Sequence, residues 1–306
     1  MRNSPGMLLA RGSTTIGKGS IAWACTFAGR IWSVLVERDG LALDTRFVPP
    51  VEGDPKPNGC VYLLLHGTFR TFDATPARHE GPCAFVVTDE QLDGGRGVRV
   101  MPLRATGAPY RAIELHLALA DILSPPGVVT LDAATWDAAV RAGRLREHTS
   151  DDALVSPITA LIEHLAAAGV IRKEAVAVAL KPTSPTFGRL WAALRPMVER
   201  LYLAPTIQQV SDATGVSGRQ LDRYIRDFVH AFGLVGAGWR PATRHLRLKL
   251  SVIMLSAEGA SVGDVARIVG YGSSDAMARA FRDAKMPAPS TIQDELRRAA
   301  DEAARG

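Results

Sequence analysis

Arginines recur at helical spacing in two stretches of the last third of the chain. The first stretch reads GVSGRQLDRYIRD from Gly215, and the second reads GYGSSDAMARAFRDA from Gly270. Their arginines are Arg219, Arg223, Arg226, Arg279 and Arg282. A guanidinium is a planar fork of N–H donors that pairs with guanine or clasps a phosphate. The spacing therefore indicates either helices that lay arginines along an anionic polymer or ordinary solvated helix faces.

Each arginine-bearing helix is expected to be the second helix of a helix-turn-helix. The repeated units are TIQQVSDATGVSGRQLDRYIRDF (206–228) and SVGDVARIVGYGSSDAMARAFRDA (261–284). Thr206 precedes Gln209 by three positions, and Ser261 precedes Asp264 in the same way, which is the spacing of a capping box. Gly215 and Gly270 permit a sharp end to the first helix. Ser217, with Gln220, and either Ser273 or Ser274 then cap the second helix.

Apolar periodicity predicts which faces are buried. In the first helices, Ile207 and Val210 of one unit and Val262, Val265 and Ala266 of the other are expected to face inward. In the second helices the inward residues are Leu221, Ile225 and Phe228, and Met277, Phe281 and Ala284. The opposite face of the first copy carries three arginines and Asp222, and that of the second carries Asp275 and two arginines. Asp222–Arg226 and Asp275–Arg279 also have the spacing of ordinary intrahelical ion pairs.

The charge distribution favours the same segment. The chain of 306 residues has a net charge of +5, with 47% apolar and 22% charged residues. Residues 1–183 contain 19 Lys and Arg and 19 Asp and Glu, whereas residues 184–306 contain 17 and 12. The basic excess therefore lies where the repeated units lie, which favours an anionic partner there.

Other bulk features exclude several classes. The sequence has no apolar run long enough to cross a membrane, and its N-terminal apolar block is too short for a signal peptide, so a cytoplasmic protein is expected. Cys25, Cys60 and Cys83 are far apart and form no Cys-x-x-Cys pair, so buried, packed thiols are expected in preference to a reactive or sensing thiol.

The first 120 residues read as short strands separated by turns. The predicted strands span 20–27, 30–37, 60–67, 83–89, 98–104 and 110–119, with turn signals at Asp39-Gly40, Asp93-Gly94-Gly95 and 106–109. Many short strands at near-regular spacing favour an antiparallel barrel or sandwich.

The pattern becomes helical from about Leu131. In LVSPITALIEHLAAAGVI (154–171), one stripe contains Leu154, Ile158, Leu161, Ile162 and Leu165. Such a stripe is usually core, and a dimerisation helix is the alternative. KPTSPTFG (181–188) has the composition of an interdomain linker. We therefore expect an α+β protein with a β-rich sensor or dimerisation domain over 1–180, a linker over 181–188 and an all-α domain over 189–306.

With both units in view, the C-terminal segment resembles the DNA-binding domain of AraC/XylS-type transcriptional regulators. The similarity covers LWAALRPMVERLYL (190–203), LDRYI, the helix around HLRLKLSVIMLSAEGAS (245–261), VARIVGYGSSDAMARAF and Pro289. Tyr271, Met277, Met286 and Ile292 depart from the usual family residues. The connection after Phe228 is longer than usual, and Pro241 is expected to break a helix there.

The resemblance implies two helix-turn-helix units, joined by a linker helix, in successive major-groove segments of double-stranded DNA. Arg226 and Arg282 are assigned to phosphates. An aspartate near bases suggests recognition of the cytosine amino group or orientation of a neighbouring arginine. The base-reading positions fall on Arg219, Asp222, Arg223, Ser274, Asp275, Ala278 and Arg279, and Ser217 belongs to the same surface. The first copy is the more basic and is expected to contribute more affinity.

The resemblance also implies a cupin-like N-terminal domain that binds an effector or mediates dimerisation. Its candidate metal ligands, His66, His79, Glu80, Glu114 and His116, lack a His-x-His pairing, so no metal or other cofactor and no catalytic residue is expected. The alternative is a cupin-type metal-dependent enzyme fused to a helix-turn-helix domain. A DNA-repair methyl acceptor with the same paired units needs four cysteine ligands and is excluded by three scattered cysteines.

A non-enzymatic transcription regulator is therefore expected. Its predicted partners are double-stranded DNA, a second copy of the chain, a small-molecule effector, and RNA polymerase if the protein activates transcription, with no membrane.

Overall fold

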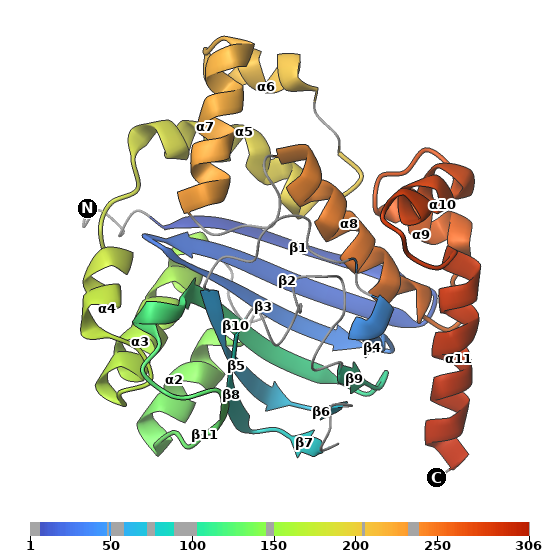
Figure 1. Cartoon of the computed structure of the whole chain (residues 1–306), viewed down its shortest axis with the longest axis horizontal. Helices are drawn as coiled ribbons and strands as arrows, with labels where there is room; N and C mark the ends of the chain where they lie inside the picture. The colour runs from blue at the N-terminus through green and yellow to red at the C-terminus, as the bar shows by residue number, and fades with distance from the viewer. Residues whose placement is uncertain are drawn as a thin grey trace.

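The computed structural model describes residues 7–47, 49, 58–71, 77–88, 103–144, 150–203, 206–231 and 239–305. Strands fill the N-terminal part and helices follow from residue 133 onward, so the predicted α+β class is confirmed (Figure 1). The strands are β1 (Leu8–Ile16), β2 (Gly19–Ala28), β3 (Ile31–Asp39), β4 (Leu43–Asp44), β5 (Asn58–His66), β6 (Thr68–Thr71), β7 (Arg78–Glu80), β8 (Cys83–Thr88), β9 (Leu103–Ala105), β10 (Tyr110–Ala118) and β11 (Gly127–Val129).

The strands form two antiparallel sheets. The larger has the order β1-β2-β3-β10-β5-β8-β11, and the smaller has the order β4-β9-β6-β7. Antiparallel pairing throughout agrees with the predicted barrel or sandwich. Two short 3-10 helices, Thr45–Phe47 and Leu119–Asp121, follow β4 and β10.

The long strands lie close to their predicted positions. β2, β3, β5, β8 and β10 match the predicted ranges to within about two residues at each end. Of the strand predicted over 98–104, only the end is described, as part of β9, and the turn predicted at residues 93–95 lies outside the described residues. β1 was not predicted, because its sequence, LLARGSTTI, ends in small polar residues that resemble a loop.

Three helices cover one face of the larger sheet. These are α2 (Ala133–Ala142), α3 (Asp151–Ala167) and α4 (Lys173–Ala179), and Figure 1 shows them on one side of the strands. All five residues of the α3 stripe are at most 2% exposed, in a core shared with Leu35, Ile113 and other sheet residues. The stripe is therefore core, and the alternative that it forms a dimerisation face is wrong.

The remaining helices lie across the opposite face of the sheet and beyond it. They are α5 (Pro185–Glu199), α6 (Ile207–Thr214), α7 (Gly218–Ala231), α8 (Trp239–Leu255), α9 (Val262–Ile268), α10 (Ser274–Asp283) and α11 (Pro289–Arg305). α5 begins at Pro185 with Ser184 as its N-cap. Of the segment predicted as a linker, only residues 181–184 connect two helices, because a proline fits the first helical turn.

The β-rich and helical parts share hydrophobic cores. Leu8, Ala10 and Phe27 pack with residues of α5, α6 and α7, and Ile16, Ile21 and Trp23 pack with residues of α8 to α11. The Trp191 indole donates a hydrogen bond to the Leu9 carbonyl (2.9 Å), and the Trp23 indole donates one to the Val198 carbonyl (3.2 Å). The helical part is therefore seated on the sheet.

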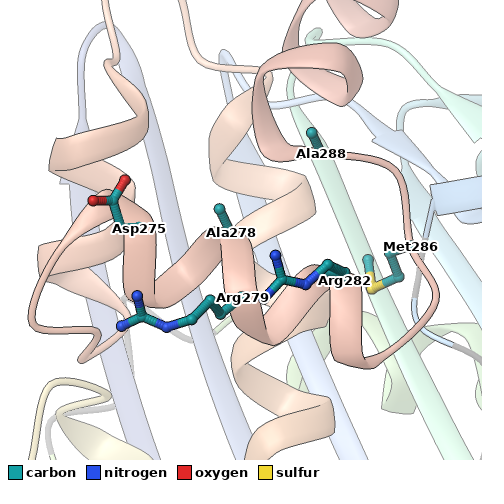
Figure 2. A pocket seen from close by; sticks show the side chains of 6 residues that line it. All are labelled: Asp275, Ala278, Arg279, Arg282, Met286 and Ala288. Carbon is teal, nitrogen blue, oxygen red and sulfur yellow. The ribbon is translucent and has the colours of Figure 1, made fainter.

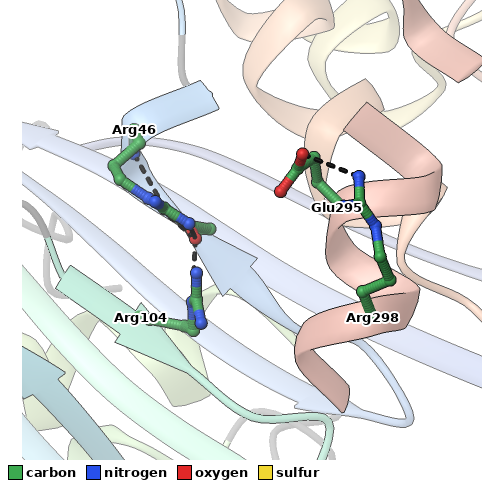
Figure 3. A network of polar contacts seen from close by, with 5 residues as sticks. Arg46, Arg104, Glu295 and Arg298 are labelled. Atoms are coloured by element: carbon green, nitrogen blue, oxygen red, sulfur yellow. Dashed lines mark hydrogen bonds and ion pairs between the residues drawn. The ribbon is translucent and has the colours of Figure 1, made fainter. Parts of the chain in front are cut away.

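Polar contacts add to this interface. The Ala42 amide donates to the Ser256 hydroxyl (2.8 Å), and the exposed Lys18 and Glu258 side chains form an ion pair. Near α11, Asp44 accepts hydrogen bonds from Arg46 and Arg104, while Glu295 pairs with Arg298 on α11 itself (Figure 3). Burial alone would raise the pKa of Asp44, but these two guanidinium groups hold it below its usual value.

Pro241 does not break a helix, contrary to the prediction. It is the third residue of α8. The first amides of a helix have no acceptor within it, so a proline there removes no helical hydrogen bond. The rest of the long connection, residues 232–238, lies outside the described residues.

Candidate DNA-binding surface

The first helix-turn-helix is closed by the contacts that its sequence predicts. The Gln209 amide donates to Thr206 Oγ1 (3.2 Å), and the Thr206 amide donates to Gln209 Oε1 (2.7 Å), which completes a capping box. Gly215 ends α6 in the left-handed region, with φ of 68°. Ser217 Oγ then accepts a hydrogen bond from the Gln220 amide (3.4 Å) at the start of α7. α6 and α7 therefore form a tight, doubly capped corner.

The second unit repeats this design. Ser261 and Asp264 form a capping box at α9, and the hydrogen bond from Ser261 holds the pKa of Asp264 below its usual value. Gly270 has φ of 83°, and the serine that caps α10 is Ser273, which accepts from the Ala276 amide (3.1 Å). Ser274, the other candidate cap, is the first residue of α10.

The predicted inward faces are buried, with one exception. Leu221, Ile225 and Phe228 on α7, and Met277 and Phe281 on α10, are at most 3% exposed. Val210, Val265 and Ala266 are also buried, while Val262 and Ala284 are partly buried against the same core. The prediction for Ile207 is wrong, because it is 44% exposed. As the first residue of α6, its side chain points back past the helix end, beyond the reach of α7.

The outward face of α7 presents the predicted polar residues to solvent. Ser217, Arg219, Asp222, Arg223 and Arg226 are all exposed. Asp222 and Arg226 form an intrahelical ion pair, which is the alternative that their spacing also allowed. Arg226 Nη2 lies 3.0 Å from Asp222 Oδ2, and both side chains are 60% exposed. The Arg223 guanidinium lies 5.4 Å from the centre of the Tyr224 ring. Arg219 and Arg223 are thus the two arginines of this face without an ion pair among the described residues.

The outward face of α10 lines an open groove. Its walls are Asp275, Ala278, Arg279, Arg282, Met286 and Ala288, around a cavity of about 550 Å³ (Figure 2). Arg279 and Arg282 extend along the groove, and Figure 2 shows the Asp275 carboxylate directed away from the Arg279 guanidinium. Ser274 is exposed at the start of the same helix. The structure therefore brings together the residues predicted for the second unit.

Two groove residues were not predicted. Met286 and Ala288 follow α10 in the turn to α11, where Lys285 has the left-handed φ of 56°. This turn folds the chain back beside α10. Pro289, at the start of α11, marks the turn in the sequence, but its direction depends on packing against α8.

Part of the basic excess serves packing. On α8, Arg244 donates to the Ala280 carbonyl of α10 (3.2 Å), and Arg247 donates to the Leu203 carbonyl (2.9 Å). Burial lowers the pKa of Arg247, which lies beside Tyr271 at the turn of the second unit. Arg244 thus ties α8 to the second unit, and Arg247 ties α8 to the connection between α5 and α6. The net charge of the segment therefore overstates the charge available to a partner.

The predicted metal-ligand candidates do not converge. His116 Nε2 lies 3.2 Å from Glu114, and its ring stacks on Trp32, whereas His79 packs against Phe69 and Phe85. Within the described ranges, no group of three or more His, Cys, Asp or Glu side chains could hold a metal ion. The described helices likewise include none that is long and apolar enough to span a membrane.

The fold and site together define an α+β chain with an antiparallel β-part and paired helix-turn-helix units. No family model and no curated protein matches the sequence. Among solved structures, ToxT from Vibrio cholerae is similar with 7% identity and a TM-score of 0.36, over 94% of this chain and 98% of that one.

Two further solved structures are similar to this chain. The AraC-like transcriptional activator CuxR is similar with 14% identity and a TM-score of 0.32, over 87% of this chain and 92% of that one. The cupin domain of Schizosaccharomyces pombe Cnp3 has 18% identity and a TM-score of 0.22, over 32% and 64%.

Proposed function

We propose that this protein is a sequence-specific, DNA-binding transcription regulator. The observation that supports this role is the pair of capped helix-turn-helix units, in each of which the second helix has an exposed face with arginines and an inward apolar face that packs in the core. An exposed second helix with basic residues is the element that enters the major groove in this motif. Arg219, Asp222, Arg223, Ser274, Asp275, Ala278 and Arg279 are proposed to face bases, and Arg226, Arg282 and Ser217 the backbone.

The β-rich part is proposed to bind an effector or to mediate dimerisation. Its support is the shared core, because a conformational change of β1 or β2 acts directly on helices that seat the first unit. An effector that binds two arrangements of the sheet with different affinity shifts the population that binds DNA. A homodimer, and contact with RNA polymerase if the protein activates transcription, are parts of the same proposal.

Selection from random duplex DNA followed by affinity measurement tests this function. The selected sequence should be bound about 10³-fold or more tightly than a scrambled duplex. Arg223→Ala and Arg279→Ala should each weaken binding by roughly 1–3 kcal/mol, because each variant lacks a guanidinium that hydrogen-bonds to a base edge. Failure to enrich any sequence would contradict the proposal.

Arg298→Ala is the matched control. Arg298 is an exposed arginine that pairs with Glu295 on α11, away from both arginine faces, and its loss changes the net charge by the same amount. This variant should bind the selected duplex as tightly as the parent. An equal loss in all three variants would indicate a general charge effect and would exclude the assigned base contacts.

A further inference from the structure

Arg244 on α8 reaches across to the second helix of the second unit. Its Nη2 atom donates a hydrogen bond to the carbonyl of Ala280 on α10, at 3.2 Å. Ala280 directly follows Arg279, which is proposed to face a base. The Arg244 side chain is part-buried in this contact, whereas the arginines on the outward face of α10 are exposed. The contact therefore joins α8 to the helix that is proposed to enter the major groove.

The Ala280 carbonyl has its helical hydrogen bond without this donor. It accepts the Ala284 amide at 3.1 Å. A carbonyl oxygen has two lone pairs, so it can accept from Arg244 as well. The bond is charge-assisted and lies near the C-terminal end of α10, where the helix dipole favours a cation. Arg244 thus adds a directed contact between two helices and is not needed to complete α10 itself.

The packing of α10 shows what such a contact adds. α10 has ten residues, and its large apolar side chains are Met277 and Phe281, which are both fully buried. These two residues lie four positions apart, along one line of the helix surface. Apolar contacts are non-directional, so a single line of them resists rotation about the helix axis only weakly. Ala280 lies beside this line, and its bond to Arg244 therefore opposes rotation of α10.

α8 is itself held in place at the level of Arg244 and beyond. Val252 and Leu255 are fully buried in the core that α8 shares with the second unit. Arg247, three residues after Arg244, donates a hydrogen bond to the Leu203 carbonyl at 2.9 Å. Arg244 therefore extends from an anchored helix, which is what a positioning contact requires.

We infer that Arg244 is a positioning residue of the DNA-binding surface. Its bond to Ala280 fixes the rotation of α10 so that Asp275 and Arg279 face the bases, and Arg244 itself does not contact DNA. This role rests on the proposed DNA binding and adds to it. A guanidinium in this segment would otherwise be assigned to a phosphate, and substitution distinguishes the two roles.

Affinity measurements on Arg244→Met make this distinction, with the duplex selected by the parent protein and a scrambled duplex. The affinity for the selected duplex should fall at least about five-fold, because Arg279 is displaced from its base edge. The affinity for the scrambled duplex and its salt dependence should not change. Loss of a phosphate contact would instead weaken binding to both duplexes and make the slope of log K against log salt less steep by about 0.9. That result would overturn the positioning role.

Selection from random DNA with the variant separates positioning from general destabilisation. Arg244→Met should lose base preference in the half-site read by the second unit and keep it in the half-site read by the first. A uniform loss of preference in both half-sites would overturn the positioning role. If circular dichroism shows that Arg244→Met is unfolded, Arg244→Gln replaces it, because its polar side chain is too short to reach the Ala280 carbonyl. The same loss in one half-site is then expected.

Arg240→Met is the matched control. Arg240 lies one turn earlier on α8, is exposed, and its loss changes the net charge by the same amount. The ratio of the affinities for the selected and scrambled duplexes should not change in this variant, and an equal fall in both variants would overturn the role of Arg244. If the parent protein enriches no sequence, the proposed function fails and this role with it. If the parent enriches a sequence that Arg244→Met binds equally well, only the positioning role fails.

Discussion

Individual arginines on the two second helices have different expected roles, which salt dependence separates. Arg282 is assigned to a phosphate, so Arg282→Ala should weaken binding to cognate and scrambled duplexes alike. The slope of log K against log salt should become less steep by about 0.9, because one fewer counter-ion is released. Titrations at several salt concentrations measure this slope, and an unchanged slope with altered base preference would assign Arg282 to a base.

The ranking of the two units is also a residue-scale question. The first copy is more basic in sequence, but Arg226 is already paired with Asp222. Arg219 and Arg223 then compare with Arg279 and Arg282 on nearly equal terms. The larger contribution expected of the first copy remains a prediction. Measuring the DNA affinity of the double variant Arg219→Ala/Arg223→Ala against that of Arg279→Ala/Arg282→Ala tests it directly.

The two turn glycines should differ in their tolerance of a methyl group. Both have positive φ, which alone costs an alanine about 1 kcal/mol. At Gly215 a Cβ meets nothing within 4 Å, whereas at Gly270 it would lie 2.7 Å from the Leu201 carbonyl oxygen and 2.9 Å from the Tyr202 Cα. Gly270→Ala should therefore lower the free energy of unfolding by about 2–4 kcal/mol, and Gly215→Ala by about 1 kcal/mol. Urea unfolding measures both, and equal losses would contradict this account.

At the scale of elements, local signals made both helix-turn-helix units predictable. Caps and turn glycines act within a few residues, so Thr206, Ser261, Gly215 and Gly270 identify the helix ends directly. Ile207 was wrongly predicted to be buried. Apolar periodicity shows which face of α6 is directed inward, but it does not show how far along that face the neighbouring helix α7 extends. β1 and the turn carrying Met286 escaped prediction because distant partners, α5 and α8 among them, determine their positions.

Phe27 joins a strand of the larger sheet to the first unit. Its ring lies 4.9 Å from that of Trp191 on α5 and 5.7 Å from that of Phe228 on α7. Phe27→Ala should lower the free energy of unfolding by about 3–5 kcal/mol, because it leaves a cavity between the two parts. Val128→Ala is the control, since Val128 is 69% exposed and its loss should cost less than about 0.5 kcal/mol. Similar losses for both variants in urea unfolding would argue against a shared core.

At the scale of the molecule, an electrostatic interaction between Glu114 and Lys249 connects the sheet to α8. Burial would raise the pKa of Glu114 on β10, but the charge of Lys249 on α8, and then the hydrogen bond with His116, lower it to about 2. Burial raises the pKa values of Cys25, Tyr62 and Tyr110, and the nearby charge of Glu114 adds to this effect. Because the folded pKa is depressed, the stabilisation is present above about pH 4.5 and disappears as the pH falls towards 2.

Lys249→Met should therefore destabilise the protein mainly near neutral pH. We expect a loss of about 1–3 kcal/mol at pH 7 that shrinks between pH 5 and pH 2, as Glu114 becomes protonated in both proteins. Unfolding by urea across this pH range measures the difference. Lys249→Arg keeps the charge and should retain the parent profile, whereas a loss independent of pH would assign Lys249 to packing alone.

The contact of α5 with β1 has a consequence for how the halves of this protein behave apart. β1 is an edge strand of the larger sheet, and α5 covers it through Trp191. An uncovered edge strand of nine residues is a template for pairing between chains. A β-rich fragment that ends before α5 would expose this edge together with Leu8, Ala10 and Phe27, and we expect it to self-associate. The helical half thus protects the β-rich half from self-association. The oligomeric state of an isolated β-rich fragment would therefore not report that of the intact chain.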